Sequence, residues 1–92
     1  MAQLIKANQL DVIDVLPANG RDFKYEELRN YVGGYIEILH LNANQTLVVN
    51  EEGKLLNLPY NTIATEVIRM AYQGCDDFIV GDALLCDRSQ LK

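Results

Sequence analysis

The sequence has few cysteines, few cationic side chains and no long apolar run, and each shortage excludes a class of protein. Two cysteines, Cys75 and Cys86, are too few for the disulfide framework of a small secreted domain. No stretch approaches the ~20 apolar residues that cross a bilayer, so we expect no membrane association. The apolar run within residues 1–6 is too short for a signal peptide, which predicts a cytoplasmic protein with free thiols.

Positive charge is scarce and dispersed. The chain has 13 Asp and Glu residues against 8 Lys and Arg, for a net charge of −5. The cationic side chains are scattered singly from Lys6 to Lys92, so no basic face is available for a nucleic acid backbone. The carboxylates form no dense run of the kind that a DNA mimic needs. We therefore expect no binding to a nucleic acid backbone, and the net charge indicates ordinary solubility.

The composition is that of one small folded domain. With 92 residues, of which 49% are hydrophobic and 23% charged, the chain is long enough to bury one core but not two. A small core leaves a thin margin of stability, and no predicted edge strand carries a block of lysine or proline. We therefore expect a homo-oligomer.

Hydrophobic periodicity and turn residues predict seven elements in the order ββαββαβ. This order favours an α+β domain with a mainly antiparallel sheet and two helices covering one face. The domain should span residues 1–87, with a loose tail at 88–92. The predicted strands are residues 3–7, 11–16, 35–42, 45–50 and 78–86, and the predicted helices are residues 24–32 and 61–73.

The second helix has the clearest signals. Asn61 is suited to the N-cap, with Pro59 just outside, and Gly74 ends the helix. One face of it, at helical spacing, holds Ile63, Val67, Met70 and Ala71. We expect the core to draw on every element and to contain Ile5, Val15, Leu28, Val32, Ile38, Val48, Ile63, Val67, Ile79 and Leu84.

Three blocks of the chain carry a family resemblance. They are VGGYIE at residues 32–37, NEEGKLLNLPYNTIAT at 50–65 and IVGDAL at 79–84. In this order and spacing they resemble the bacterial and phage domain-of-unknown-function family 3846, over roughly residues 4–85. One departure is Asn57, where the resemblance implies a glycine before Leu58. The resemblance implies no known activity, but it implies a phage, plasmid or conjugative-element setting and therefore a small accessory or counter-defence role.

Two candidate site residues lie near the start of the second helix. The free amides and the dipole of a helix N-terminus attract anions, which makes Asn61 and Thr65 candidate ligands for a small anionic group. Simple capping explains Asn61 equally well. Thr65 lies one turn further along, where capping does not explain it.

The other four candidates lie on or beside strands. Tyr35 and Glu37 share one strand face. There they would either hydrogen-bond a ligand or form the solvent-exposed side of a half-buried strand. Asn50 and Glu51 lie at the end of a predicted strand. They would either form a polar cluster that binds a ligand or belong to a solvated turn. An asparagine on the face that Val48 occupies must either cap a turn or meet a partner.

Catalytic signatures are missing. His40 is the one histidine, and nothing places a nucleophile beside it. Cys75 and Cys86 lack the paired spacing of a zinc site, and no glycine loop of the phosphate-binding type occurs. We predict no catalytic residue, metal or cofactor.

The expected function is therefore that of an acidic binding module. It would sequester or inhibit a host factor, either a host protein or a small anionic ligand such as a nucleotide. Two alternatives stay open. One is an enzyme of unknown type with Glu37 or Glu51 as general base, and the other is a purely structural interaction protein.

Overall fold

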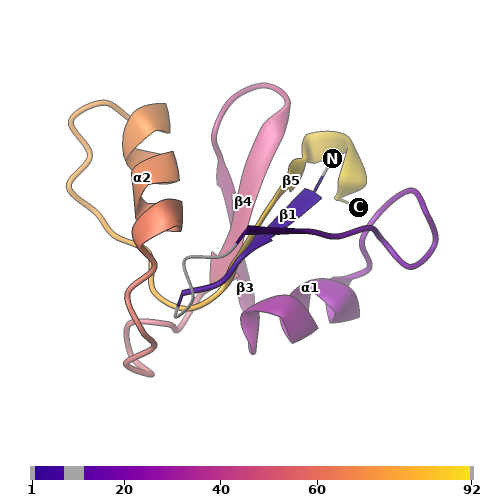
Figure 1. Cartoon of the computed structure of the whole chain (residues 1–92), viewed down its shortest axis with the longest axis horizontal. Helices are drawn as coiled ribbons and strands as arrows, with labels where there is room; N and C mark the ends of the chain where they lie inside the picture. The colour runs from indigo at the N-terminus through magenta and orange to yellow at the C-terminus, as the bar shows by residue number, and fades with distance from the viewer. Residues whose placement is uncertain (1, 8–11, 92) are drawn as a thin grey trace.

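The computed structural model of the chain describes residues 2–7 and 12–91, which form one antiparallel sheet with a helix on each face (Figure 1). The strand order is β2-β1-β5-β4-β3, so β2 and β3 are the edges. The predicted α+β class and the order of elements are confirmed. The elements are β1 Ala2–Ile5, β2 Val12–Asp14, α1 Tyr25–Val32, β3 Ile36–His40, β4 Gln45–Asn50, α2 Thr62–Ala71 and β5 Ala83–Asp87.

The two helices cover opposite faces of the sheet, so the prediction that both cover one face is wrong. On one face α1 packs Leu28 and Val32 against Val48 of β4. On the other face α2 packs Ala64 and Ile68 against strand residues that include the next residue of β4, Val49. The physical reason lies in the central strands. Residues 47–49 of β4 are apolar and buried on both faces, so each face needs its own cover.

The predicted core is largely confirmed. Val15, Ile63 and Val67 are half-buried against it. Ile38 is the exception, with 39% of its surface exposed, because β3 is an edge strand with neighbours on one side only. The predicted residues that are fully buried are Ile5, Leu28, Val32, Val48, Ile79 and Leu84.

The face that α2 turns toward the sheet differs from the predicted one. Its buried residues are Ala64, Thr65 and Ile68, whereas Met70, placed by the helical spacing on the same face as Ile63 and Val67, is 82% exposed. The apolar pattern is misleading here because Thr65 is polar and yet lies against the sheet. Its hydroxyl has partners there, as described below.

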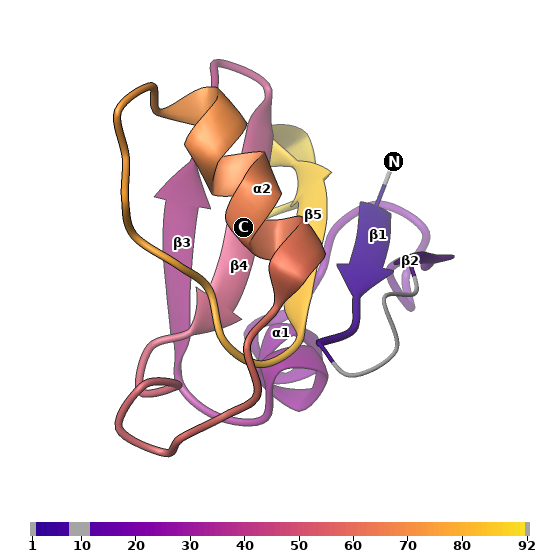
Figure 2. The same ribbon diagram turned by 60° about the vertical axis from the view of Figure 1, so that its left-hand side comes forward.

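The predicted strand at 78–86 is shorter and later than expected. Only Ala83–Asp87 pair in the sheet, and residues 78–82 form an extended segment with one isolated bridge, between Tyr60 and Val80. Gly81 has φ of 78°, a left-handed conformation that interrupts a strand. Figure 2 shows this connection leaving α2 and running past β3 before it reaches β5.

The expected tail at 88–92 is ordered as far as residue 91. Arg88–Gln90 form a 3-10 turn, and Leu91 forms a parallel bridge with Phe23. The Phe23 N–H donates to the Gln90 carbonyl at 2.7 Å. Residue 92, like residue 11 of the predicted second strand, lies outside the described residues.

Candidate functional site

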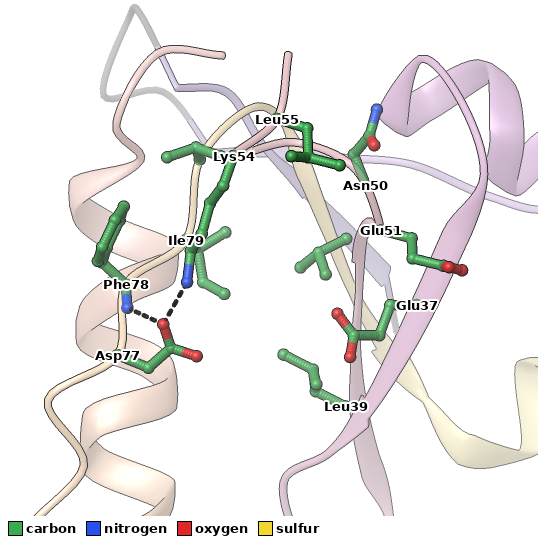
Figure 3. Close-up of a pocket in the computed structure, with 11 residues that line it drawn as sticks. Glu37, Leu39, Asn50, Glu51, Lys54, Leu55, Asp77, Phe78 and Ile79 are labelled. Carbon is green, nitrogen blue, oxygen red and sulfur yellow. Dashed lines mark hydrogen bonds and ion pairs between the residues drawn. The ribbon is translucent and has the colours of Figure 1, made fainter. Parts of the chain in front are cut away.

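A pocket of about 200 Å³ opens between β3 and the segment from Asp77 to Val80 (Figure 3). It lies on the α2 face of the sheet, because Leu39 and Val49, which line it, pack with the core residues on that side. We call it the acidic pocket. Its lining residues come from β3, β4, the loop after β4 and the segment before β5: Glu37, Leu39, Val49, Asn50, Glu51, Lys54, Leu55, Asp77, Phe78, Ile79 and Val80.

The Thr65 hydroxyl and the backbone N–H of Asn61, the N-cap of α2, hold one wall of the pocket in place. The Thr65 hydroxyl accepts a hydrogen bond from the Ile79 N–H at 2.9 Å and donates to the Ile79 carbonyl at 3.4 Å. The Asn61 N–H also donates to the Ile79 carbonyl, at 2.8 Å. These bonds satisfy the backbone N–H and C=O groups of Ile79, which are not paired with a neighbouring strand.

Two glycines bring the loop after β4 close to the same wall. A Cβ at Gly53 would lie 2.8 Å from a Val80 methyl group, and a Cβ at Gly81 would lie 2.8 Å from a Leu58 methyl group. Neither position has room for a side chain without a shift of its neighbour. Both glycines therefore serve close packing, and the loop and the wall are positioned as one unit.

Asn57 is the one described non-glycine residue with a positive φ, at 53°. This is the position at which the resemblance implied a glycine. Asparagine enters the left-handed region more readily than other non-glycine residues, so the loop keeps the conformation that a glycine would permit.

The pocket has more negative than positive charge. Glu37, Glu51 and Asp77 contribute carboxylates, and Lys54 contributes the one cationic side chain of the lining. Lys54 is anchored by an ion pair with Asp77, and its ammonium group lies 4.3 Å from the centre of the Phe78 ring. The hydrogen bond from Lys54, followed by that from the Phe78 N–H, holds the pKa of Asp77 below its ordinary value.

The directions of the side chains divide the lining into two groups. Figure 3 shows the Glu37 carboxylate pointing into the pocket, toward the wall that carries Asp77 and Lys54. The Glu51 and Asn50 side chains point away from it. The carboxylate that a ligand meets first on the β3 side is therefore that of Glu37.

Of the six predicted site residues, the pocket brings together Glu37, Asn50 and Glu51. Asn50 contributes little beyond its backbone, because its side chain is buried on the α1 face. There it donates to the Val32 carbonyl at 3.1 Å and accepts from the Glu52 N–H at 2.8 Å. It caps a turn, which is one of the two roles expected for it.

The other three predicted site residues lie elsewhere. Tyr35 lies against Arg29, whose guanidinium carbon is 4.7 Å from the ring centre. The Asn61 side chain caps α2 through the Ala64 N–H at 3.0 Å and donates to two buried carbonyls. The Thr65 hydroxyl is hydrogen-bonded to the backbone of Ile79. The Asn61 side chain and the Thr65 hydroxyl thus already have hydrogen-bond partners within the chain.

Sequence reasoning missed Lys54, Asp77 and Phe78. Lys54 and Asp77 are 23 residues apart in two different loops. Hydrophobic periodicity does not predict that such residues form a pair. Phe78 was assigned to the start of a strand. The available signals were indirect: Thr65, a polar residue on an apolar helix, and Gly53 and Gly81, each a sign of close backbone approach.

Two absences concern residues 2–7 and 12–91, the part of the chain that the structure describes. In this part of the chain, no group of three or more His, Cys, Asp and Glu side chains is placed to hold a metal ion. Nor does it contain a helix long and apolar enough to cross a membrane. Cys75 and Cys86 are both free thiols.

The comparison with known proteins identifies the family. Residues 7–90 match the family described as a domain of unknown function, DUF3846, which covers nearly the whole chain. The chain therefore belongs to this family, as the resemblance of its three sequence blocks implied. No curated protein and no solved structure matches the chain.

Proposed function

We propose that this member of the DUF3846 family is a binding module, not a catalyst, and that it holds a basic segment of another protein at the acidic pocket. The observation that carries the proposal is the lining of the pocket. It combines the inward-pointing Glu37 carboxylate with an apolar floor that includes Leu39 and Ile79. Such a surface complements a cationic side chain with an apolar stem.

The rim supports a protein partner. Leu55 at the rim is 82% exposed, and the Phe78 ring stacks with Tyr60 at a centroid distance of 5.9 Å. Exposed aromatic and leucine side chains beside a polar pocket are typical of protein-binding surfaces. A partner with apolar residues next to a basic one would cover both features.

Size and charge favour this partner over the anionic nucleotide that was the other expectation. Ligand pockets usually measure about 300–1,000 Å³, so about 200 Å³ suits one side chain better than a nucleotide. The carboxylates would also repel phosphate. In addition, Asn61 and Thr65, the residues expected to bind an anion, make hydrogen bonds inside the chain.

The biological setting is part of the proposal. We propose a cytoplasmic accessory protein of a phage or mobile element that sequesters or inhibits a host protein through this pocket. We also propose that the chain self-associates through β2, the edge strand far from the pocket, where Val12 and Ile13 are exposed. Light scattering that stays at the 10.4 kDa monomer mass at every concentration would contradict the self-association alone.

The test is the affinity for a basic peptide. A labelled heptapeptide of alternating lysine and valine should bind the wild-type protein, and binding should weaken as salt rises. Glu37→Gln should weaken binding by about two- to five-fold, the worth of one partly exposed charge pair. Glu66→Gln, on the exposed side of α2, is the matched control and should leave the affinity unchanged. Equal affinity of all three proteins, or tighter binding of a nucleotide than of the peptide, would reject the proposal.

The second candidate function is an enzyme with Glu37 as general base. It is favoured by the direction of the carboxylate, which points into the pocket, whereas Glu51 points away. Incubation with nucleotides, nucleic acids and peptides distinguishes the two candidates. Turnover that Glu37→Gln abolishes and Glu66→Gln preserves would favour the enzyme. A purely structural interaction protein would bind its partner with no dependence on Glu37.

A further inference from the structure

One edge of the sheet is open beside the acidic pocket. The outermost strand β3 bonds to β4, as shown by the Glu51 N–H donating to the Tyr35 carbonyl at 2.9 Å and the Leu41 N–H donating to the Gln45 carbonyl at 3.0 Å. Backbone groups in an antiparallel pair alternate between the two sides of a strand. Since the odd-numbered residues 35 and 41 face β4, the backbone groups of Ile36, Ile38 and His40 face away from it.

A side chain contact agrees with this alternation. The Tyr72 hydroxyl donates to the His40 carbonyl, which therefore faces outward, and it closes that end of the edge. For Ile36 and Ile38, the described part of the chain supplies no partner to the outward N–H and C=O groups. The edge strand also carries no lysine or proline, which commonly block such edges.

The open edge and the acidic pocket share residues. Side chains alternate along β3, so Glu37 and Leu39 line the pocket on the α2 face while Ile36 and Ile38 lie on the α1 face. A strand added beside β3 would place every second side chain on the same face of the sheet as Glu37. The side chains between them would lie next to Ile38, which is 39% exposed.

We propose that the partner segment binds by adding to β3 as a further strand. The segment is an extended chain with alternating basic and apolar side chains. Its basic residues lie beside Glu37, and its apolar residues cover Ile38. The inference rests on the proposed function for the choice of a basic partner, and it adds the mode of binding: backbone hydrogen bonds to Ile36 and Ile38, with alternate side chains giving specificity.

Backbone methylation of the probe tests this mode on the unaltered protein. In the alternating lysine–valine heptapeptide, the N–H groups of one residue type face β3 and those of the other type face solvent. Two isomeric probes, N-methylated at the interior lysines or at the interior valines, keep the side chains and the charge. We expect one isomer to lose at least about ten-fold in affinity while the other retains it, because only one loses donors to β3. Equal affinity of both isomers and the parent peptide would overturn the inference.

A proline variant tests the protein side. The Ile38 N–H faces outward, so Ile38→Pro removes a donor from the open edge and leaves the bonds to β4 in place. Ile38→Ala keeps the donor and is the matched control, and circular dichroism checks that both variants fold. We expect Ile38→Pro to weaken peptide binding at least about ten-fold and Ile38→Ala by less than about three-fold.

The outcomes separate the two proposals. If Ile38→Pro and both methylated probes bind normally while Glu37→Gln weakens binding, strand addition is wrong and the acidic pocket still binds the basic segment. If the wild-type protein binds none of the probes, the proposed function fails and this inference fails with it.

Discussion

Removal of the Asn61 side chain is the sharpest test of how the start of α2 is joined to the rest of the domain. This side chain is 1% exposed and joins three segments of the chain. Its amide nitrogen donates to the carbonyls of Ile5 and Gly81, at 2.9 and 2.8 Å. Its oxygen accepts from the Ala64 N–H at 3.0 Å and caps α2. Asn61→Ala breaks all three bonds at once.

The expected loss follows from these contacts. Loss of a helix N-cap costs about 1 kcal/mol. Each of the two lost hydrogen bonds to buried carbonyls costs about 0.5–1.5 kcal/mol. The sum is about 2–4 kcal/mol, whereas a domain of this length is stable by roughly 5–14 kcal/mol. Asn61→Ala should therefore remove a large part of the stability of the domain.

Urea denaturation followed by far-ultraviolet circular dichroism measures this loss, with linear extrapolation giving the free energy of unfolding in water. Asn44→Ala, in the exposed turn between β3 and β4, is the matched control and should change the free energy by less than about 0.5 kcal/mol. A loss below about 1 kcal/mol for Asn61→Ala would show that these three hydrogen bonds contribute little to stability. Asn61 would then be free to serve as a ligand residue.

Three further predictions concern single side chains. The N–H groups of Lys24 and Ala18 hold the pKa of Glu27 below its ordinary 4.5, so its contribution to stability is present above that value and lost as pH falls through the lowered pKa. Glu27→Gln should therefore flatten the fall in melting temperature from pH 5 to pH 3, and an unchanged fall would contradict this. Burial raises the pKa of the Cys86 thiol, so iodoacetamide should label half-exposed Cys75 first in the folded protein, as mass spectrometry of peptides would show. Asn57→Gly should be neutral or stabilise by up to about 1 kcal/mol, whereas Asn57→Val should destabilise by about 1–2 kcal/mol in the same denaturation assay.

Much of the fold was predictable because local signals agree with the tertiary arrangement. Asn61 occupies the predicted N-cap, and Gly33 ends α1 in the left-handed conformation. The turn between β3 and β4 is closed by Asn42, whose side chain accepts from the N–H groups of Asn44 and Gln45 at 2.8 and 2.9 Å. Each signal lies within a few residues of the structure that it specifies.

What could not be predicted depends on contacts between distant segments. Periodicity shows that a strand is apolar, but it does not show which helix covers which face. The acidic pocket depends on the pairing of Lys54 with Asp77 and on the wall that Thr65 holds at Ile79. Thr65 was singled out as unexplained by capping, and its partner is a backbone segment that the sequence pattern assigned to a strand.

Amide chemical-shift mapping shows directly whether a basic segment binds at the acidic pocket. The ¹⁵N-labelled protein is titrated with the alternating lysine–valine peptide at low salt. The largest shifts should occur at Glu37, Lys54 and Phe78, on β3 and the two segments that face it. Shifts gathered instead around Arg29 and Gly34, at the end of α1, or no shifts at saturating peptide, would contradict binding at the acidic pocket.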